Sequence, residues 1–381
     1  MAGIRMIIGG DLVPTPSNAH LFSSGDAEEL LGQDLLGELS KADYRVVNLE
    51  VPLTDQEVPI LKNGPNLFSP TSVVKGIAAM GVNLVTLANN HCLDNGEQGL
   101  FSTLETLQDN GVDWVGAGPD LLAAAEPYIL AMNGLRIGFY ACAEHEFSIA
   151  AHNGAGANPF DPLDSLDHVS DLKKCCDYVI VLYHGGRELY RYPSPGLQKS
   201  CRKLAEKGAD LIICQHSHCI GAFEQYEGSM VVYGQGNFLF DYEEDEFTST
   251  SLLIDVEFTD TEMTVNFLPI IKQGNVVRMA SPPIAAEILT AFRQRSEQIL
   301  DDGFIQSHYD QLAIQKLNGY LAAFKGNSLL YRFMNKLSGN RLASFMYSER
   351  SLNRLRNYIE CEAHRELILT GLRKRLAIRG K

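Results

Sequence analysis

The sequence contains no long apolar segment and no cysteine framework, and we expect no leader peptide. No apolar run reaches the ~18 residues that span a bilayer. The opening MAGIRMIIGGD has an apolar run that is too short for a signal peptide, and no small-residue cleavage site follows it. The eight cysteines are scattered and form no CxxC pair, which argues against a disulfide scaffold. These absences predict a reduced, cytoplasmic protein without a transmembrane segment.

Positive charge is scarce and unevenly distributed. The 381 residues include 32 lysines and arginines against 47 aspartates and glutamates, a formal net charge of −15, which argues against nucleic-acid binding. Residues 276–381 carry 17 basic against 9 acidic side chains, whereas residues 1–275 carry 15 against 38. We therefore predict two units, a main domain over residues 1–275 and a basic helical extension over residues 276–381.

Hydrophobic periodicity predicts that strands and helices alternate in the first two-thirds of the chain. Strands are expected at 4–9, 44–50, 82–91, 112–118, 178–186 and 210–218, and helices at 27–39, 71–80, 97–110, 165–174 and 196–207. Asn133-Gly134 predicts a tight hairpin between strands 128–132 and 135–141. Shorter strands are expected at 222–226, 230–233, 251–257 and 263–270. This order indicates an α/β layered domain with some antiparallel strands.

The pattern becomes helical after residue 282. Residues 284–300, 309–324 and 349–377 have apolar side chains at helical spacing, and the last segment is basic toward its end. Such a segment could pack on the core or lie against a partner. We therefore expect that the C-terminal helices offer a site for a protein partner.

At least five strand-like runs end in polar side chains that can bind a metal. These side chains are Asp11, Asn48 with Glu50, Asn90 with His91, His184, and His216 with His218. Ligands of open α/β sheets bind beyond the carboxyl ends of the strands, so we expect these groups to converge on one rim. Oxygen and imidazole ligands match Mn²⁺, Zn²⁺ or Fe²⁺. Two such ions about 3.5–4 Å apart need a bridging carboxylate, a role that Glu50 fits, and could activate a water against a phosphoryl or carbonyl centre.

Each member of this set also has a structural explanation. Asp11 after two glycines fits an Asx-turn, and His184 before two glycines fits a buried histidine bonded to a backbone carbonyl. A single His-x-His pair is a weak signal. The joint occurrence at successive strand ends favours a metal site. Whether His216 and His218 bind one ion or two stays open.

The loop GGRELYRYPSPGLQ after His184 carries arginines flanked by tyrosines. Arg187 suits bidentate recognition of a carboxylate or phosphate, although a plain surface loop is an equal alternative. We expect Arg187 to act in catalysis and in substrate binding. Asn48, Tyr190 and Asn237 are further substrate-binding candidates.

Several segments resemble, in order, the motifs of the CapA family of poly-γ-glutamate capsule biosynthesis proteins. They are GGDLVPT, NLEVPLTD, LANNHCLDNGEQGLFSTLETLQDNGVDWVGAG, LYHGGRELYRYPSPGLQ and GADLIICQHSHCIGAFEQYEGSMVVYGQGNFLFD. The family domain is similar to the calcineurin-like metallophosphoesterases. The resemblance covers roughly two-thirds of the chain and implies a four-layer α/β/β/α sandwich with a dinuclear metal site between its sheets.

The resemblance also implies individual roles. The implied metal ligands are Asp11, Glu50, Asn90, His184, His216 and His218, with Glu50 as the bridge. His91 is implied as a general acid or oxyanion stabiliser that faces the substrate, and Asp94 could orient it. The chain departs from related phosphoesterases in two places, because it has Asp11-Leu12-Val13 where they carry Asp-x-His, and its bridging residue is Glu rather than Asp.

These observations predict a metal-dependent hydrolase with a centre of Mn, Fe or Zn. The expected substrate is a phosphoester or an amide of a small or polymeric acidic, glutamate-like compound, linked to poly-γ-glutamate or capsule polymer biosynthesis. The alternative is an accessory, non-catalytic component of a polymer-synthesis complex. Its basic helices would then dock an anionic polymer, a membrane surface or a synthetase.

Overall fold

The computed structural model describes residues 3–241, 245–324, 329–339, 341–360, 364–365, 368–369 and 371–372. The chain divides into two compact units, Met1–Ile305 and Gln306–Lys381. The expected boundary after residue 275 lies elsewhere for a physical reason. Strand β16 (Val276–Met279) pairs with β15 (Met263–Gln273), and Phe292 of helix α8 (Pro282–Gln298) is fully buried in the core. The first unit therefore extends past residue 275 to Ile305.

The first sheet has eight strands in the order β16-β15-β14-β1-β2-β3-β4, with β13 paired to β1. The bounds are Ile4–Val13 for β1, Tyr44–Leu49 for β2, Leu84–Thr86 for β3, Asp113–Val115 for β4, Asn237–Phe240 for β13 and Thr250–Phe258 for β14. Strands β1 to β4 pair in parallel, whereas β14, β15 and β16 are antiparallel. The carboxyl ends of β1, β2 and β3 therefore meet at one edge.

The second sheet has six strands in the order β11-β12-β10-β9-β7-β6. The bounds are Tyr128–Met132 for β6, Leu135–Ala143 for β7, Tyr178–His184 for β9, Leu211–Gln215 for β10, Phe223–Tyr226 for β11 and Ser229–Val232 for β12. Strands β7, β9, β10 and β12 pair in parallel. The predicted hairpin is confirmed, since Asn133 and Gly134 both take positive φ angles, 49° and 85°. A small third sheet pairs β5 (Ala117–Gly118) with β8 (Gly156–Ala157).

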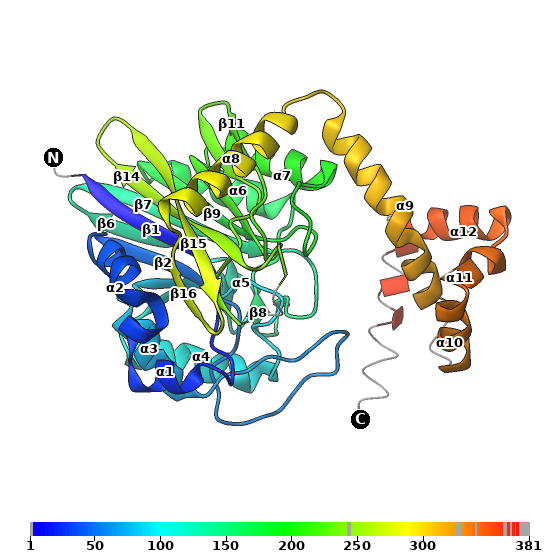
Figure 1. Cartoon of the computed structure of the whole chain (residues 1–381), viewed down its shortest axis with the longest axis horizontal. Coiled ribbons are helices and arrows are strands. Elements are labelled where there is room, and N and C mark those ends of the chain that lie inside the picture. Colours follow the sequence, from blue (N-terminus) through cyan, green and yellow to red (C-terminus); the bar gives the residue numbers. More distant parts are fainter. Residues whose placement is uncertain are drawn as a thin grey trace. The chain divides into compact units, whose positions relative to one another are not determined.

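Helices cover the outer faces of the two large sheets (Figure 1). On the first sheet these are α1 (Ala19–Ser24), α2 (Ala27–Ser40), the 3₁₀ turn Thr71–Val73, α3 (Val74–Ala79) and α4 (Gly96–Asp109). On the second sheet they are α6 (Asp164–Lys173) and α7 (Pro195–Glu206), and the short α5 (Leu121–Ala125) packs on the small sheet. One buried apolar cluster joins both sheets, for example through Ile8 and Ile180, and a second joins the second sheet to α6 and α7. The predicted four-layer α/β/β/α arrangement is confirmed.

Strand β1 is longer than expected and changes its partner partway along. Ile4–Ile8 pairs with β14, whereas Asp11–Val13 pairs with β13, and the register with β2 shifts between Ile8 and Asp11. Such a bulge redirects the strand. A Cβ atom on Gly10 would clash with the carbonyl oxygen of Gly236, so this crossing requires a glycine. The bend places Asp11 at the rim with 1% of its surface exposed.

The expected strand over residues 82–91 shortens to β3, because the chain turns after Thr86 and Asn89 N–H bonds back to the carbonyl of Leu87. The helical pattern after residue 282 is confirmed up to Glu360, as α8, α9 (Phe304–Phe324), α10 (Leu329–Leu337), α11 (Arg341–Met346) and α12 (Glu349–Glu360). Most of the expected continuation to residue 377 lies outside the described residues. No helix among the described residues has both the length and the apolar character needed to cross a membrane.

We expect Gly10→Ala to lower the free energy of unfolding by about 1–3 kcal/mol, because the added methyl group overpacks the crossing with Gly236. Gly37→Ala in α2 is the matched control. A Cβ atom at Gly37 meets no atom within 4 Å, and alanine stabilises a helix interior by about 0.5–1 kcal/mol relative to glycine. Chemical denaturation of the full-length protein measures both variants. Wild-type stability in Gly10→Ala would contradict the tight crossing.

Candidate metal centre

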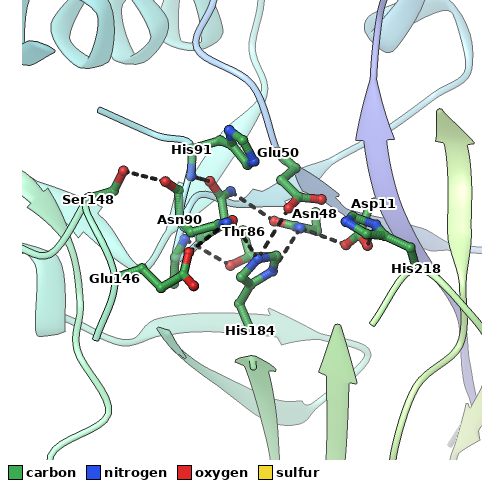
Figure 2. A network of polar contacts seen from close by, with 12 residues as sticks. Asp11, Asn48, Glu50, Thr86, Asn90, His91, Glu146, Ser148, His184 and His218 are labelled. Carbon is green, nitrogen blue, oxygen red and sulfur yellow. Dashed lines mark hydrogen bonds and ion pairs between the residues drawn. The ribbon is translucent and has the colours of Figure 1, made fainter. Parts of the chain in front are cut away.

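The side chains expected at the strand ends come together at one rim between the two large sheets (Figure 2). Three sets of residues have ligand atoms that all lie within 4.8 Å of one another, and two of these sets contain Glu50. The first ligand group is Glu50, His184 and His216, and the second ligand group is Asp11, Glu50 and His218. All five residues are buried. Glu50 belongs to both groups, which is the position that a bridging carboxylate requires.

Asn90 joins the first ligand group through His184. Its Oδ1 lies 3.0 Å from His184 Nε2, and the same nitrogen lies 3.3 Å from Glu50 Oε1. The amide group of Asn90 donates to Glu146 Oε2 at 3.0 Å, and Ser148 Oγ donates to the Asn90 carbonyl at 2.7 Å. These contacts fix the Asn90 oxygen toward the histidine (Figure 2), so one oxygen, one carboxylate and one imidazole converge.

Two asparagines contact the second ligand group. His218 Nδ1 lies 3.2 Å from Asp11 Oδ2 and 2.9 Å from Asn237 Oδ1. Asn48 Nδ2 donates to Asp11 Oδ1 at 2.8 Å and lies 3.3 Å from His184 Nδ1. Neutral amides therefore orient the ligands of both groups.

Burial and mutual charge set the protonation of the cluster. Burial raises the pKa of Glu50, but His184 and His218 lower it more, so its pKa lies below the usual range and the carboxylate is ionised. Burial and the neighbouring His184 hold the pKa of His216 well below its usual value, so this imidazole is neutral. Burial opposes the charge of His218, yet Glu50 and Asp11 raise its pKa to about 10. The protonated imidazole of His218 therefore lies beside the carboxyl groups of Glu50 and Asp11.

The residues fit a divalent cation. Both Glu50 carboxylate oxygens and His216 Nδ1 are buried, and apart from the 3.3 Å contact between Glu50 Oε1 and His184 Nε2 they have no hydrogen-bond partner among the residues that the structure describes. A buried ionised carboxylate without such partners is costly unless a cation neutralises it. Carboxylate, amide and imidazole donors match Mn²⁺, Fe²⁺ or Zn²⁺, as the sequence predicts.

The turn after β10 positions its two histidines through an unusual backbone. His216 and His218 take φ angles of 87° and 53°, in the left-handed region that side chains other than glycine rarely adopt. Each such residue costs on the order of 1–3 kcal/mol and persists only where its surroundings fix it. Ser217 Oγ, between the two, donates to the carbonyl of Cys219 at 3.1 Å. Backbone strain at His216 and His218 therefore accompanies the placement of both imidazoles in the cluster.

His91 lies next to the first ligand group and has partners of its own. Its Nδ1 lies 2.6 Å from Asp94 Oδ2, and the orienting role of Asp94 stays a prediction. Lys62 forms an ion pair with Asp94 Oδ1 and lies 3.2 Å from His91 Nδ1, and only 2% of its side chain is exposed. Backbone N–H of Leu67 also donates to Asp94 Oδ2, at 2.6 Å. Asp94 therefore links His91 to a buried ammonium group.

The four residues expected to bind substrate differ in their burial and contacts. Asn48 and Asn237 are buried and contact Asp11 and His218 respectively, and their role in substrate binding stays a prediction. Arg187 is 45% exposed, and among the described residues its ion-pair partner is Glu188, at 4.0 Å. The ring of Tyr190 packs against that of Tyr192 with centroids 6.0 Å apart. The sequence predicts that these residues lie near the rim, but it does not show which of them are buried and which are exposed.

Four residues near the site escape the sequence analysis. They are Lys62, Asn89, Glu146 and Glu188. Asn89 donates to Asn48 Oδ1 and to the carbonyl of Leu49, and it stands inside the same Asn-Asn-His motif as Asn90. Glu188 directly follows Arg187, so a search for carboxylates in that loop would have found it. Lys62 and Glu146 lie in loops with no distinguishing sequence signal.

A family model described as bacterial capsule synthesis protein PGA_cap matches residues 5–242. The PGA biosynthesis protein CapA of Bacillus subtilis (strain 168) is 32% identical over 212 residues, which cover 52% of this chain and 54% of that protein. The capsule biosynthesis protein CapA of Bacillus anthracis is 29% identical over 212 residues, which cover 53% and 52%. The chain therefore spans about half the length of these curated relatives.

Among solved structures, a novel phosphatase from Mycoplasma pneumoniae aligns with a TM-score of 0.45 at 16% identity, over 72% of this chain and 95% of that protein. The family that the sequence motifs indicate is confirmed by the family model. Since that model matches more than half of the 381 residues, the chain belongs to the PGA_cap family of bacterial capsule synthesis proteins.

Proposed function

We propose that this protein is a metal-dependent hydrolase with a dinuclear centre. The observation that carries the proposal is Glu50, a buried carboxylate that is shared by two ligand groups. A pair of divalent ions, when bound, supplies Lewis-acid activation and a water activated at neutral pH. The proposed ligands are Asp11, Glu50, Asn90, His184, His216 and His218.

His91 is the proposed general acid. Its Nδ1 contacts Asp94, which leaves Nε2 as the ring nitrogen that can give a proton to the leaving group. Asp94 fixes the ring of His91, and Lys62, which pairs with Asp94 Oδ1, keeps that carboxylate in place. This support from a buried ion pair is what a positioned proton donor needs.

The proposed substrate is a phosphoester or an amide of an acidic, glutamate-like compound in poly-γ-glutamate or capsule polymer biosynthesis. The Bacillus subtilis relative is named a PGA biosynthesis protein, which supports this class of substrate. Arg187 adds a half-exposed cation near the rim that can pair with an anionic group. The alternative role is that of an accessory protein without activity, and the variants below separate the two.

Protein purified without a histidine tag is expected to contain Mn, Fe or Zn. A chelator should lower its melting temperature, because an ion that binds only the native state stabilises it by about 2.7 kcal/mol at one hundred times Kd. Glu50→Gln is the control variant and should lose most of this shift. An unchanged melting temperature in the wild type, with no metal in elemental analysis, would contradict the metal centre.

Metal affinity should rise with pH. The raised pKa of His218, about 10, means that an incoming ion must replace its proton, so apparent affinity increases by up to about tenfold per pH unit below that pKa. Isothermal titration of Mn²⁺ in two buffers with different ionisation enthalpies measures the protons released. Binding without proton release would show that His218 does not bind an ion in place of its proton.

His91→Ala should reduce hydrolysis of a model phosphodiester or γ-glutamyl amide by about 10²–10⁴-fold, because the leaving group loses its proton donor. Its metal content should equal that of wild type, since His91 is in neither ligand group. His152→Ala, at an exposed histidine, is the matched control and should keep full activity. Full activity in His91→Ala would rule out the general-acid role, and an inactive wild type would favour the accessory role.

A further inference from the structure

The loop after β9 brings one more carboxylate to the cluster. An oxygen of Glu188 lies within 4.8 Å of ligand nitrogens of both His216 and His218. The Glu188 side chain is 47% exposed, whereas the residues of both ligand groups are buried. Glu188 therefore approaches the two histidines from the solvent side.

The backbone holds Glu188 in this place. The chain leaves β9 at His184 and turns at Gly186, whose φ angle is 106°. The backbone N–H of Leu189 then donates to the carbonyl of Ser217 at 2.9 Å, and Ser217 stands between the two histidines. Leu189 has a φ angle of 53°, a conformation that a leucine keeps only where its neighbours enforce it. The backbone conformation of this loop therefore fixes the position of Glu188 near the two histidines.

The two ligand groups are unequal without this carboxylate. The first ligand group has four protein donors once Asn90 is counted, whereas the second ligand group has three. Divalent ions of the kind that fit here take at least four ligands. We propose that Glu188 is the fourth protein ligand of the ion in the second ligand group, an inference that rests on the metal centre proposed above.

A ligand on the solvent side has a distinct role from the buried ones. A phosphate or carboxylate group of a substrate would reach the same coordination position, so Glu188 exchanges with it. Arg187 Nη1 lies 4.0 Å from Glu188 Oε2 and can pair with the released carboxylate. The loop thereby couples substrate entry to the coordination of one ion.

Titration of the metal-free full-length protein with Co²⁺, followed by visible absorption and calorimetry, tests this inference. Glu188→Gln should weaken the binding of one ion by at least about tenfold and leave the other unchanged, because even the loss of an outer partner of a ligand costs this much. Glu105→Gln in α4 is the matched control. It makes the same change at an exposed carboxylate that belongs to none of the possible metal-ligand groups among the described residues, and it should reproduce the wild-type titration.

The outcomes separate this inference from the proposed function. If wild type binds Co²⁺ and Glu188→Gln gives the same titration curve, Glu188 is not a ligand and the metal centre stands without it. If wild type binds no Co²⁺, both proposals fail. Equal melting temperatures of metal-free wild type and Glu188→Gln exclude misfolding as the reason for weaker binding.

Discussion

The buried charge of Glu50 is the constraint on which the rest of the site depends. An ionised carboxylate out of contact with water costs several kcal/mol unless other charges compensate for it. In this fold the compensation comes from the opposite sheet, because His184 ends β9 and His218 follows β10 of the second sheet, whereas Glu50 follows β2 of the first. The two sheets must therefore keep a fixed distance at this edge, and the shared apolar cluster between them provides it.

Neutral amides do much of the positioning around that charge. Asn89 holds Asn48, and Asn48 in turn donates to Asp11, while Asn237 contacts His218. An amide donor orients a carboxylate without neutralising it, whereas lysine or arginine in the same place would compete with a cation. Among the described residues, the buried side chain of Lys62 contacts Asp94 and His91, which lie outside both ligand groups. The charge of this lysine therefore lies beside His91 and Asp94 rather than beside the ligands.

The sequence predicts those parts of the site that follow from a local rule. Asp11, Glu50 and His184 follow runs of apolar residues, and parallel strands bring such ends to one edge. The pairing of β13 with β1 is a different case, since Asn237–Phe240 is a short segment behind two glycines and joins β1 through a long-range crossing. The sequence also does not show which side chains of the cluster contact one another, such as Asn48, which donates to Asp11.

The deep burial of the ligands also governs how an ion reaches them. Asn48 and Asn237 are buried against Asp11 and His218, whereas Glu188, which lies near His216 and His218, is 47% exposed. The rate at which a bound ion exchanges would then depend on the loop that carries Glu188, rather than on the two sheets, which the shared apolar cluster holds together.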